Sequence, residues 1–215
     1  MARIATAIRA KFSVEISSPS AVSVLAIYCT IRVEKLGIHP RKFYALVRLG
    51  IIEKLSWGTY RLASRRELSN PDIVTVAVRV PNGVICLISA LSYHGITTQL
   101  PREVCIALPQ GASVPRIEYP PIHVFRFSKE ALSSGVETHQ IDGVAVKVSS
   151  AEKTIADCFK FRNKIGIGTA LEALRMYLRR KSKDMDKLQK YARICRVENV
   201  LRPYLQALQQ QTKGI

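Results

Sequence analysis

The stretch that decides the fold is LGIHPRKFYALVRLGIIEKLSWGTYRL, residues Leu36–Leu62. Pro40 suits the first position of a helix, because the N–H that proline lacks would have no partner there. Phe43 and Leu46 then follow at helical spacing on one face. Gly50 is suited to a left-handed helix end. The pattern therefore predicts a short helix between the proline and the glycine.

Two strand-length runs come directly after this helix. They are Ile51–Ser56 and Thr59–Leu62, and the Trp57-Gly58 pair between them predicts a tight hairpin. Upstream, Ala21–Cys29 is expected to form the first helix of the same unit, although its β-branched residues are more frequent in strands. Helix, turn, basic helix and basic ribbon form the order of a winged helix-turn-helix, whose second helix enters the DNA major groove.

The polar face of the predicted second helix carries three cations and a tyrosine, but no acidic residue. These cations therefore lack the intrahelical ion pairs that often stabilise a soluble helix. The ribbon adds two further cations where a wing would meet phosphates. The alternative is a helical hairpin with a solvated basic face. The predicted DNA contacts are Arg41, Lys42, Tyr44, Arg48, Lys54, Trp57 and Arg61.

Length and charge limit the classes of protein to consider. The chain has 215 residues, enough for one large or two small domains. Its formal net charge of +17 favours a polyanionic partner. A membrane is the weakest of these partners, because no apolar run approaches the roughly 20 residues of a spanning helix. The first residues do not have the pattern of a secretory signal, so we expect a cytoplasmic protein.

Neither the cysteines nor the short motifs indicate a metal site or an enzyme. The five cysteines have no C-x-x-C spacing, and the four histidines have no metal-ligand spacing. Ser150-x-x-Lys153 matches the S-x-x-K pattern of penicillin-binding enzymes, but the companion motifs are absent. We therefore expect no catalytic residues, no metal and no cofactor.

The remainder of the chain reads as a second domain. The polar segment Ala63–Pro71 predicts a boundary, with domains at residues 1–66 and 70–215. Asp72–Val80 and Val84–His94 are expected helices, the second one buried. Strands are predicted at Glu103–Leu108 and His123–Phe127. A hairpin follows, with an Asp-Gly turn between Val136–Gln140 and Val144–Val148.

A series of helices is expected to end the chain. The sequence Ser149-Ser150-Ala151-Glu152 reads as a capping box that starts the first of them. In that helix Ile155, Cys158 and Phe159 should face inward, and Lys153, Asp157 and Lys160 outward. Three further helices are expected, with inward-facing leucines in the first. Their expected positions are around Leu171–Leu178, Met185–Cys195 and Val197–Gln210.

A second basic block lies among these helices. Between Arg175 and Arg196 there are nine basic and two acidic residues. A solvated helix face is the ordinary explanation for any one of them. As a group they are our candidate for the surface that meets an anionic partner. The predicted surface consists of Lys153, Arg175, Arg179, Arg180 and Lys183.

Long segments of the chain resemble the AbiEi family, antitoxins of type IV toxin–antitoxin systems often described as transcriptional regulators of viral defence. The resemblance spans about Arg32–Leu208. It is carried by the basic helix and ribbon together with GVICLISALSYHGITTQLPREVCIALPQG (Gly83–Gly111), YPPIHVFRFS (Tyr119–Ser128), GVETHQIDGVAVKVSSAEKTIADCFKFRNKIG (Gly135–Gly166) and YARICRVENVLRPYLQAL (Tyr191–Leu208). Residues before Cys29 depart from the family pattern.

The resemblance implies an α+β protein in which an N-terminal winged helix-turn-helix precedes a mixed α+β antitoxin domain that ends in a helical bundle. It also implies repression of the protein's own operon and neutralisation of a nucleotidyltransferase-like toxin, without a tight complex being required. The partners would be double-stranded operator DNA and that toxin. The alternative is an RNA-binding or toxin-sequestering interaction protein that uses the basic C-terminal surface.

Overall fold

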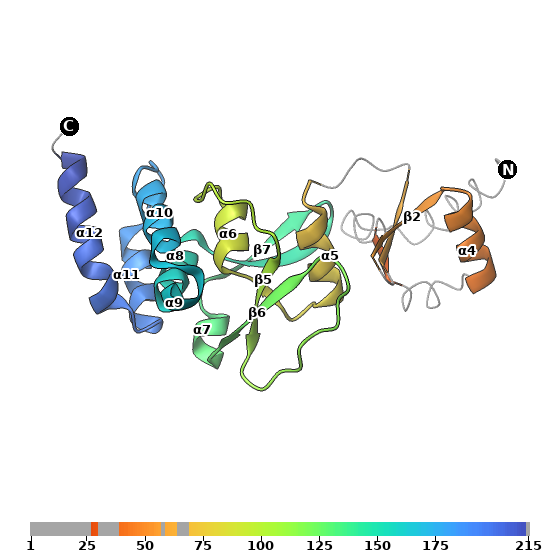
Figure 1. Cartoon of the computed structure of the whole chain (residues 1–215), viewed down its shortest axis with the longest axis horizontal. Helices are drawn as coiled ribbons and strands as arrows, with labels where there is room; N and C mark the ends of the chain where they lie inside the picture. Colours follow the sequence, from red (N-terminus) through yellow and green to blue (C-terminus); the bar gives the residue numbers. More distant parts are fainter. Residues whose placement is uncertain (1–26, 30–38, 57–58, 64–68, 214–215) are drawn as a thin grey trace, which may run out of the picture. The chain divides into compact units, whose positions relative to one another are not determined.

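The structure is a computed structural model that describes residues 27–29, 39–56, 59–63 and 69–213. Contacts divide the chain into two compact units, Met1–Arg79 with Gln140–Ala145, and Val80–His139 with Val146–Ile215. Figure 1 shows the chain and labels most of the elements. They are β1 (Ile27–Cys29), α4 (Pro40–Arg48), β2 (Ile52–Ser56), β3 (Thr59–Leu62), α5 (Pro71–Arg79), β4 (Val84–Ile85), α6 (Leu87–Tyr93), β5 (Val104–Pro109), β6 (Ile122–Phe127), α7 (Lys129–Ser133), β7 (Val136–Ile141), β8 (Val144–Ser149), α8 (Ala151–Lys160), α9 (Arg162–Ile165), α10 (Ile167–Leu178), α11 (Met185–Ile194) and α12 (Glu198–Lys213).

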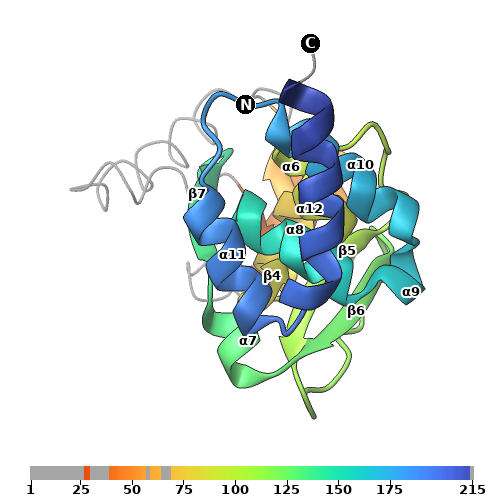
Figure 2. The ribbon, with the colours of Figure 1, turned by 90° about the vertical axis from the view of Figure 1, so that its left-hand side faces the viewer.

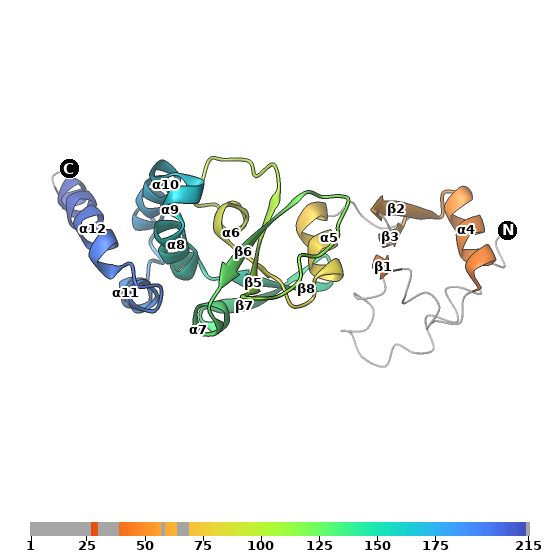
Figure 3. The ribbon, with the colours of Figure 1, turned by 60° about the horizontal axis from the view of Figure 1, so that its bottom comes forward.

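The first unit contains a three-stranded sheet with the order β1-β3-β2. Strand β3 is central: it lies between β1, which precedes α4, and β2, the first strand of the ribbon. Both of its pairings are antiparallel. Figure 3 shows α4 beside the β2–β3 ribbon. The expected first helix at Ala21–Cys29 is wrong where the structure describes it, because Ile27–Cys29 is a strand. The β-branched and aromatic side chains of this segment favour the strand.

The second unit contains most of a five-stranded sheet with the order β6-β5-β4-β8-β7, while the β7–β8 turn, Gln140–Ala145, is grouped with the first unit. Strands β5 and β6 are parallel, β4 and β5 antiparallel, and β4 and β8 parallel, so the sheet is mixed. The β7–β8 hairpin turns at Asp142-Gly143 with φ values of 50° and 82°, as predicted for an Asp-Gly turn. The predicted α+β class is confirmed.

Helices α8, α10, α11 and α12 gather at one end of the second unit (Figure 2). Helix α8 lies among the others and contacts α6, α10, α11 and α12. Its residues from Lys153 to Phe159 are all buried. The core cluster combines apolar side chains of these helices with Phe125 and Phe127 of β6. The predicted inward positions of Ile155, Cys158 and Phe159 are confirmed.

For two expected helices of the second domain, the observed bounds differ from the predicted ones. The segment expected to be one helix at Val84–His94 is a two-residue strand followed by α6, because Val84 and Ile85 join the sheet. Of the expected helix Asp72–Val80, all residues but Val80 lie in α5, which ends at Arg79. The three predicted C-terminal helices correspond to α10, α11 and α12. Within the described part of the chain, no helix has the length and apolar character needed to span a membrane.

Candidate nucleic-acid interface

Helix α4 begins and ends as its sequence predicts. His39 caps the N-terminus, and its Nδ1 accepts a hydrogen bond from the Arg41 backbone N–H at 3.3 Å. Pro40 occupies the first turn. At the other end Gly50 adopts φ +69°, and the Ile51 N–H donates to the Leu46 carbonyl at 3.0 Å. This bond closes the last turn, so the helix is confined to nine residues.

The buried face of α4 packs on the sheet of the first unit. Phe43 is 2% exposed, and its ring meets that of Tyr60 edge to face, with 4.8 Å between centroids. Leu46 is also buried. Burial raises the pKa of Tyr60, and the neighbouring Tyr44 adds to this rise. The aromatic pair therefore fixes α4 against β3.

The opposite face of α4 is exposed and cationic. Arg41, Lys42, Tyr44 and Arg48 are all exposed, as predicted. Within the described residues, none of the three cations has an acidic partner. A face that carries positive charge without internal ion pairs is suited to bind phosphates. Tyr44, 46% exposed, adds a hydroxyl and a ring to that face.

Of the predicted DNA contacts in the β2–β3 ribbon, the structure describes Lys54 and the backbone of Arg61. Lys54 lies exposed in β2, with its Cα opposite that of Tyr60. Arg61 lies in β3, paired with Glu53 on one side and with Ile27 on the other. Trp57 and Gly58 lie outside the described residues. The structure thus joins the predicted helix and ribbon contacts on one small sheet, and leaves Trp57 undescribed.

Only some residues of the predicted C-terminal basic surface are exposed to solvent. Arg175, Arg179 and Lys183 are exposed, on α10 or just after it. Arg180 is half-buried, and its guanidinium donates to the His94 carbonyl. The Lys183 ammonium donates to the Leu178 carbonyl at 3.0 Å. These two cations therefore also hold the α10–α11 turn in place.

Lys153 does not belong to that surface. It is 1% exposed, and its ammonium lies 2.5 and 2.6 Å from the two carboxylate oxygens of Asp157, which is 0% exposed. The prediction that both face outward is wrong, because the middle of α8, from Lys153 to Phe159, is buried on all its faces. A charge buried in this way requires a partner, and the i,i+4 spacing supplies one. The helix cap is Ser150, whose Oγ accepts from the Lys153 N–H, and not the predicted Ser149.

The ion pair is shielded from solvent by its neighbours. The Cys195 thiol donates to Asp157 Oδ1 at 3.3 Å, and burial raises the pKa of this thiol to about 12. The Lys153 ammonium also lies 5.0 Å from the Phe127 ring centroid. Burial raises the pKa of Asp157, while the adjacent Lys153 opposes the rise. Helical spacing pairs the two charges, but only the tertiary structure buries them.

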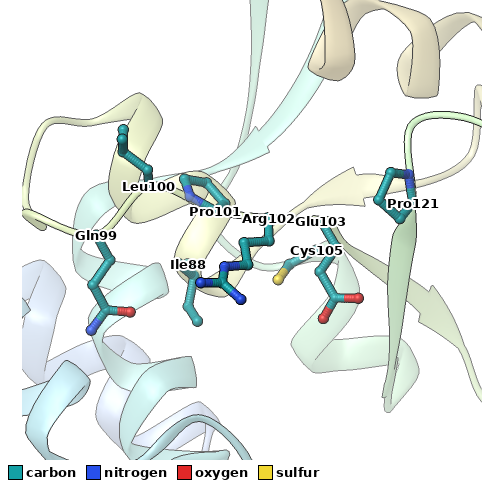
Figure 4. A pocket seen from close by; sticks show the side chains of 8 residues that line it. All are labelled: Ile88, Gln99, Leu100, Pro101, Arg102, Glu103, Cys105 and Pro121. Carbon is teal, nitrogen blue, oxygen red and sulfur yellow. The ribbon is translucent and has the colours of Figure 1, made fainter.

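A separate pocket of about 530 Å³ opens in the second unit (Figure 4). It is lined by Ile88, Gln99–Glu103, Cys105 and Pro121. Its charged lining is of mixed sign, Arg102 and Glu103, and Glu103 is already paired with His123 Nδ1 at 2.7 Å. The pocket contains none of the predicted site residues. In the described residues no group of three or more histidines, cysteines and carboxylates is arranged to hold a metal ion.

Comparison with solved structures finds only distant likeness in fold. No family model matches the chain, and no curated protein matches it. The chain is similar to the crystal structure of the RV2827C protein from Mycobacterium tuberculosis, with 12% sequence identity and a TM-score of 0.48. The alignment covers 89% of this chain and 80% of that one.

Proposed function

We propose that this chain binds double-stranded DNA through a winged helix-turn-helix, with α4 as the recognition helix and β2–β3 as the wing. The observation that carries the proposal is the sheet order β1-β3-β2. The strand before α4 pairs with the second strand of the ribbon, so helix and ribbon share one scaffold. A winged helix is built in this order, which supports the proposal more directly than charge does.

The exposed face of α4 supports the same function. Arg41 and Lys42 lie in its first turn, where a recognition helix contacts base edges and nearby phosphates. Arg48 extends the positive charge to the last turn. Because the buried face is occupied by Phe43 and Leu46, these cations remain available to a partner in solution. Phosphate contacts would position the helix, and Tyr44 would lie beside them.

The experiment for DNA binding is a footprint of the purified protein on the region upstream of its own gene. A protected site of limited length, competed poorly by unrelated duplex, is the expected result. Protection spread evenly along the duplex would indicate binding through net charge alone. That outcome would contradict a recognition helix.

We further propose that the protein is a repressor and antitoxin of an AbiEi-type operon and counteracts a nucleotidyltransferase-like toxin. The long sequence resemblance supports this role. The exposed Arg175 and Arg179 are the proposed antitoxin surface, with Lys183 beside them. The test is co-expression with a nucleotidyltransferase-like toxin encoded in the same operon. Growth should be rescued by the full chain and less well by Arg175→Glu with Arg179→Glu.

The matched control reverses two exposed charges elsewhere in the second unit, Lys129→Glu with Lys147→Glu. Net charge changes equally in both double variants, so a difference between them identifies the surface and not the total charge. Equal rescue by both would reject the proposed antitoxin surface. A second candidate function, an RNA-binding or toxin-sequestering protein, is favoured by the same exposed cations. It predicts a stable complex with RNA or toxin that the Arg175 and Arg179 reversals abolish.

A further inference from the structure

Strand β6 lies at one edge of the five-stranded sheet, next to β5 (Figure 2). The Val104 N–H donates to the Pro121 carbonyl at 2.8 Å, and the Gln110 N–H donates to the Phe127 carbonyl at 3.2 Å. In a parallel ladder, alternate residues of a strand bond to the same neighbour. His123 and Phe125 therefore also face β5 with their backbone groups.

The intervening residues Ile122, Val124 and Arg126 direct their backbone N–H and C=O groups away from β5. Within the described part of the chain, these groups have no hydrogen-bond partner. The free edge does not extend beyond these residues in either direction. Pro120 has no N–H to offer, and the Ser128 carbonyl accepts from Leu132 at the start of α7. The free edge is thus three residues long, and such an edge is a template for another strand.

We propose that this edge pairs with β6 of a second copy of the chain, antiparallel and centred on Val124. In that register Val124 faces its own symmetry mate, and Ile122 faces the Arg126 of the other copy. All three outward residues then exchange N–H···O=C bonds with their counterparts, which gives six bonds by symmetry. The two five-stranded sheets become one continuous sheet across a two-fold axis.

The side chains suit this register on both faces of the sheet. On one face two β-branched valines meet at the axis, and the apolar stem of Arg126 covers Ile122. On the other face, His123 of one copy lies opposite Phe125 of its mate in the closely spaced, non-hydrogen-bonded pairs. The two rings are already stacked within one copy, with 4.4 Å between centroids. Cross-strand pairs of aromatic and of β-branched residues stabilise antiparallel strands.

Charge distinguishes a second copy from an acidic peptide on the same edge. Arg126 does not face its own mate in the proposed register, since four residues along the strand separate the two. Each copy nevertheless carries a formal net charge of +17, so the copies repel each other at long range. Salt screens this repulsion, and self-association should therefore strengthen as salt is raised. Binding of an acidic peptide would weaken instead.

The test measures the oligomeric state of the full chain by analytical ultracentrifugation over protein and salt concentration. The variants are Val124→Lys and Val124→Asp, because the residue at the axis faces itself. Each variant alone places two like charges opposite each other and should dimerise about tenfold more weakly. Mixing the two should restore the dimer, since lysine then faces aspartate. Val124 is only partly buried, so both side chains can reach solvent in the monomer.

Circular dichroism of each variant checks that the fold is retained. Should either charged variant fail to fold, Val124→Pro is the second variant. Proline removes only the outward N–H and leaves the bonds to β5 intact, so it too should weaken the dimer. A chain that stays monomeric at every protein and salt concentration would overturn the proposal. Dimerisation of Val124→Lys as strong as that of the native chain would overturn it as well.

Discussion

At Lys153 and Asp157, two opposite charges lie within one buried helix, sealed by Cys195 and Phe127. Removing one partner leaves the other charge buried and unpaired. Lys153→Met is therefore expected to lower the free energy of unfolding by about 3–5 kcal/mol. The double change to Lys153→Met with Asp157→Leu should cost less than this single one, because no charge remains. Urea unfolding followed by far-UV circular dichroism measures both, and a double variant less stable than the single would refute the account.

Two glycines with similar backbone angles differ in the space around them. Gly135 adopts φ +64°, and an added Cβ would lie 2.8 Å from both Lys153 Cβ and Tyr191 Cζ. Gly95 adopts φ +62°, and the nearest atom to its added Cβ is 3.8 Å away. Gly95→Ala should cost only the left-handed conformation, about 1 kcal/mol. Gly135→Ala should cost at least about 2 kcal/mol more, because backbone or helix α11 must shift. Equal losses in thermal unfolding of the two variants would contradict this packing.

Stability is expected to depend on pH through the buried side chain of His94. Its Nε2 lies 2.7 Å from the Ser149 carbonyl, so this nitrogen carries the proton of the neutral ring. Burial lowers the pKa of His94 below 6.5, although the Ser149 bond opposes this. The folded state therefore binds fewer protons than the unfolded state just below pH 6.5. Stability should be full above that pH and fall as pH drops through the folded pKa.

The matched variant is His94→Gln, whose amide can still donate to Ser149 but does not titrate. The native chain should lose more stability than this variant between pH 7.5 and about 5.5, the span in which histidine takes up its proton. Parallel pH profiles of unfolding would show that His94 is not the responsible group.

At the scale of one element, two adjacent residues of α4 have different roles: Phe43 packs in the core, and Tyr44 is proposed to contact DNA. Phe43→Ala should destabilise the first unit by about 3 kcal/mol, because it removes a buried ring. Tyr44→Ala should leave stability within about 0.5 kcal/mol, since that side chain is largely exposed. It should nevertheless weaken DNA binding several-fold. Urea unfolding followed by far-UV circular dichroism measures the stability of both variants. A Tyr44 variant that binds DNA normally would remove Tyr44 from the interface.

How far the elements can be predicted from sequence depends on whether local signals determine them. Pro40, Gly50 and the Asp142-Gly143 turn act within a few residues, and the helix ends and hairpin follow from them. The strand at Val84–Ile85 could not be predicted in this way, because it is created by pairing with Ala107 and Ile106. The burial of Lys153 depends equally on distant helices. Exposure of a charged residue cannot be inferred from periodicity when that part of the helix is buried on all its faces.

At the scale of the whole molecule, a formal net charge of +17 would attract any polyanion without a specific site. Binding through the recognition helix α4 requires that two of these charges, Arg41 and Lys42, contact DNA at defined phosphates. Most other exposed cations should contribute only to the long-range attraction, which salt screens. The salt dependence of binding distinguishes the two, because each direct phosphate contact adds to its slope.

The most direct measurement is therefore the affinity of the full chain for its upstream DNA as a function of salt concentration. Three proteins should be compared: the native chain, Arg41→Ala with Lys42→Ala, and a control in which Lys129 and Lys147 are replaced by alanine. The account predicts that the first double variant lowers the slope of log K against log salt by up to about two units. The control should leave that slope unchanged. Slopes that are equal in all three proteins would contradict a DNA-binding role for α4.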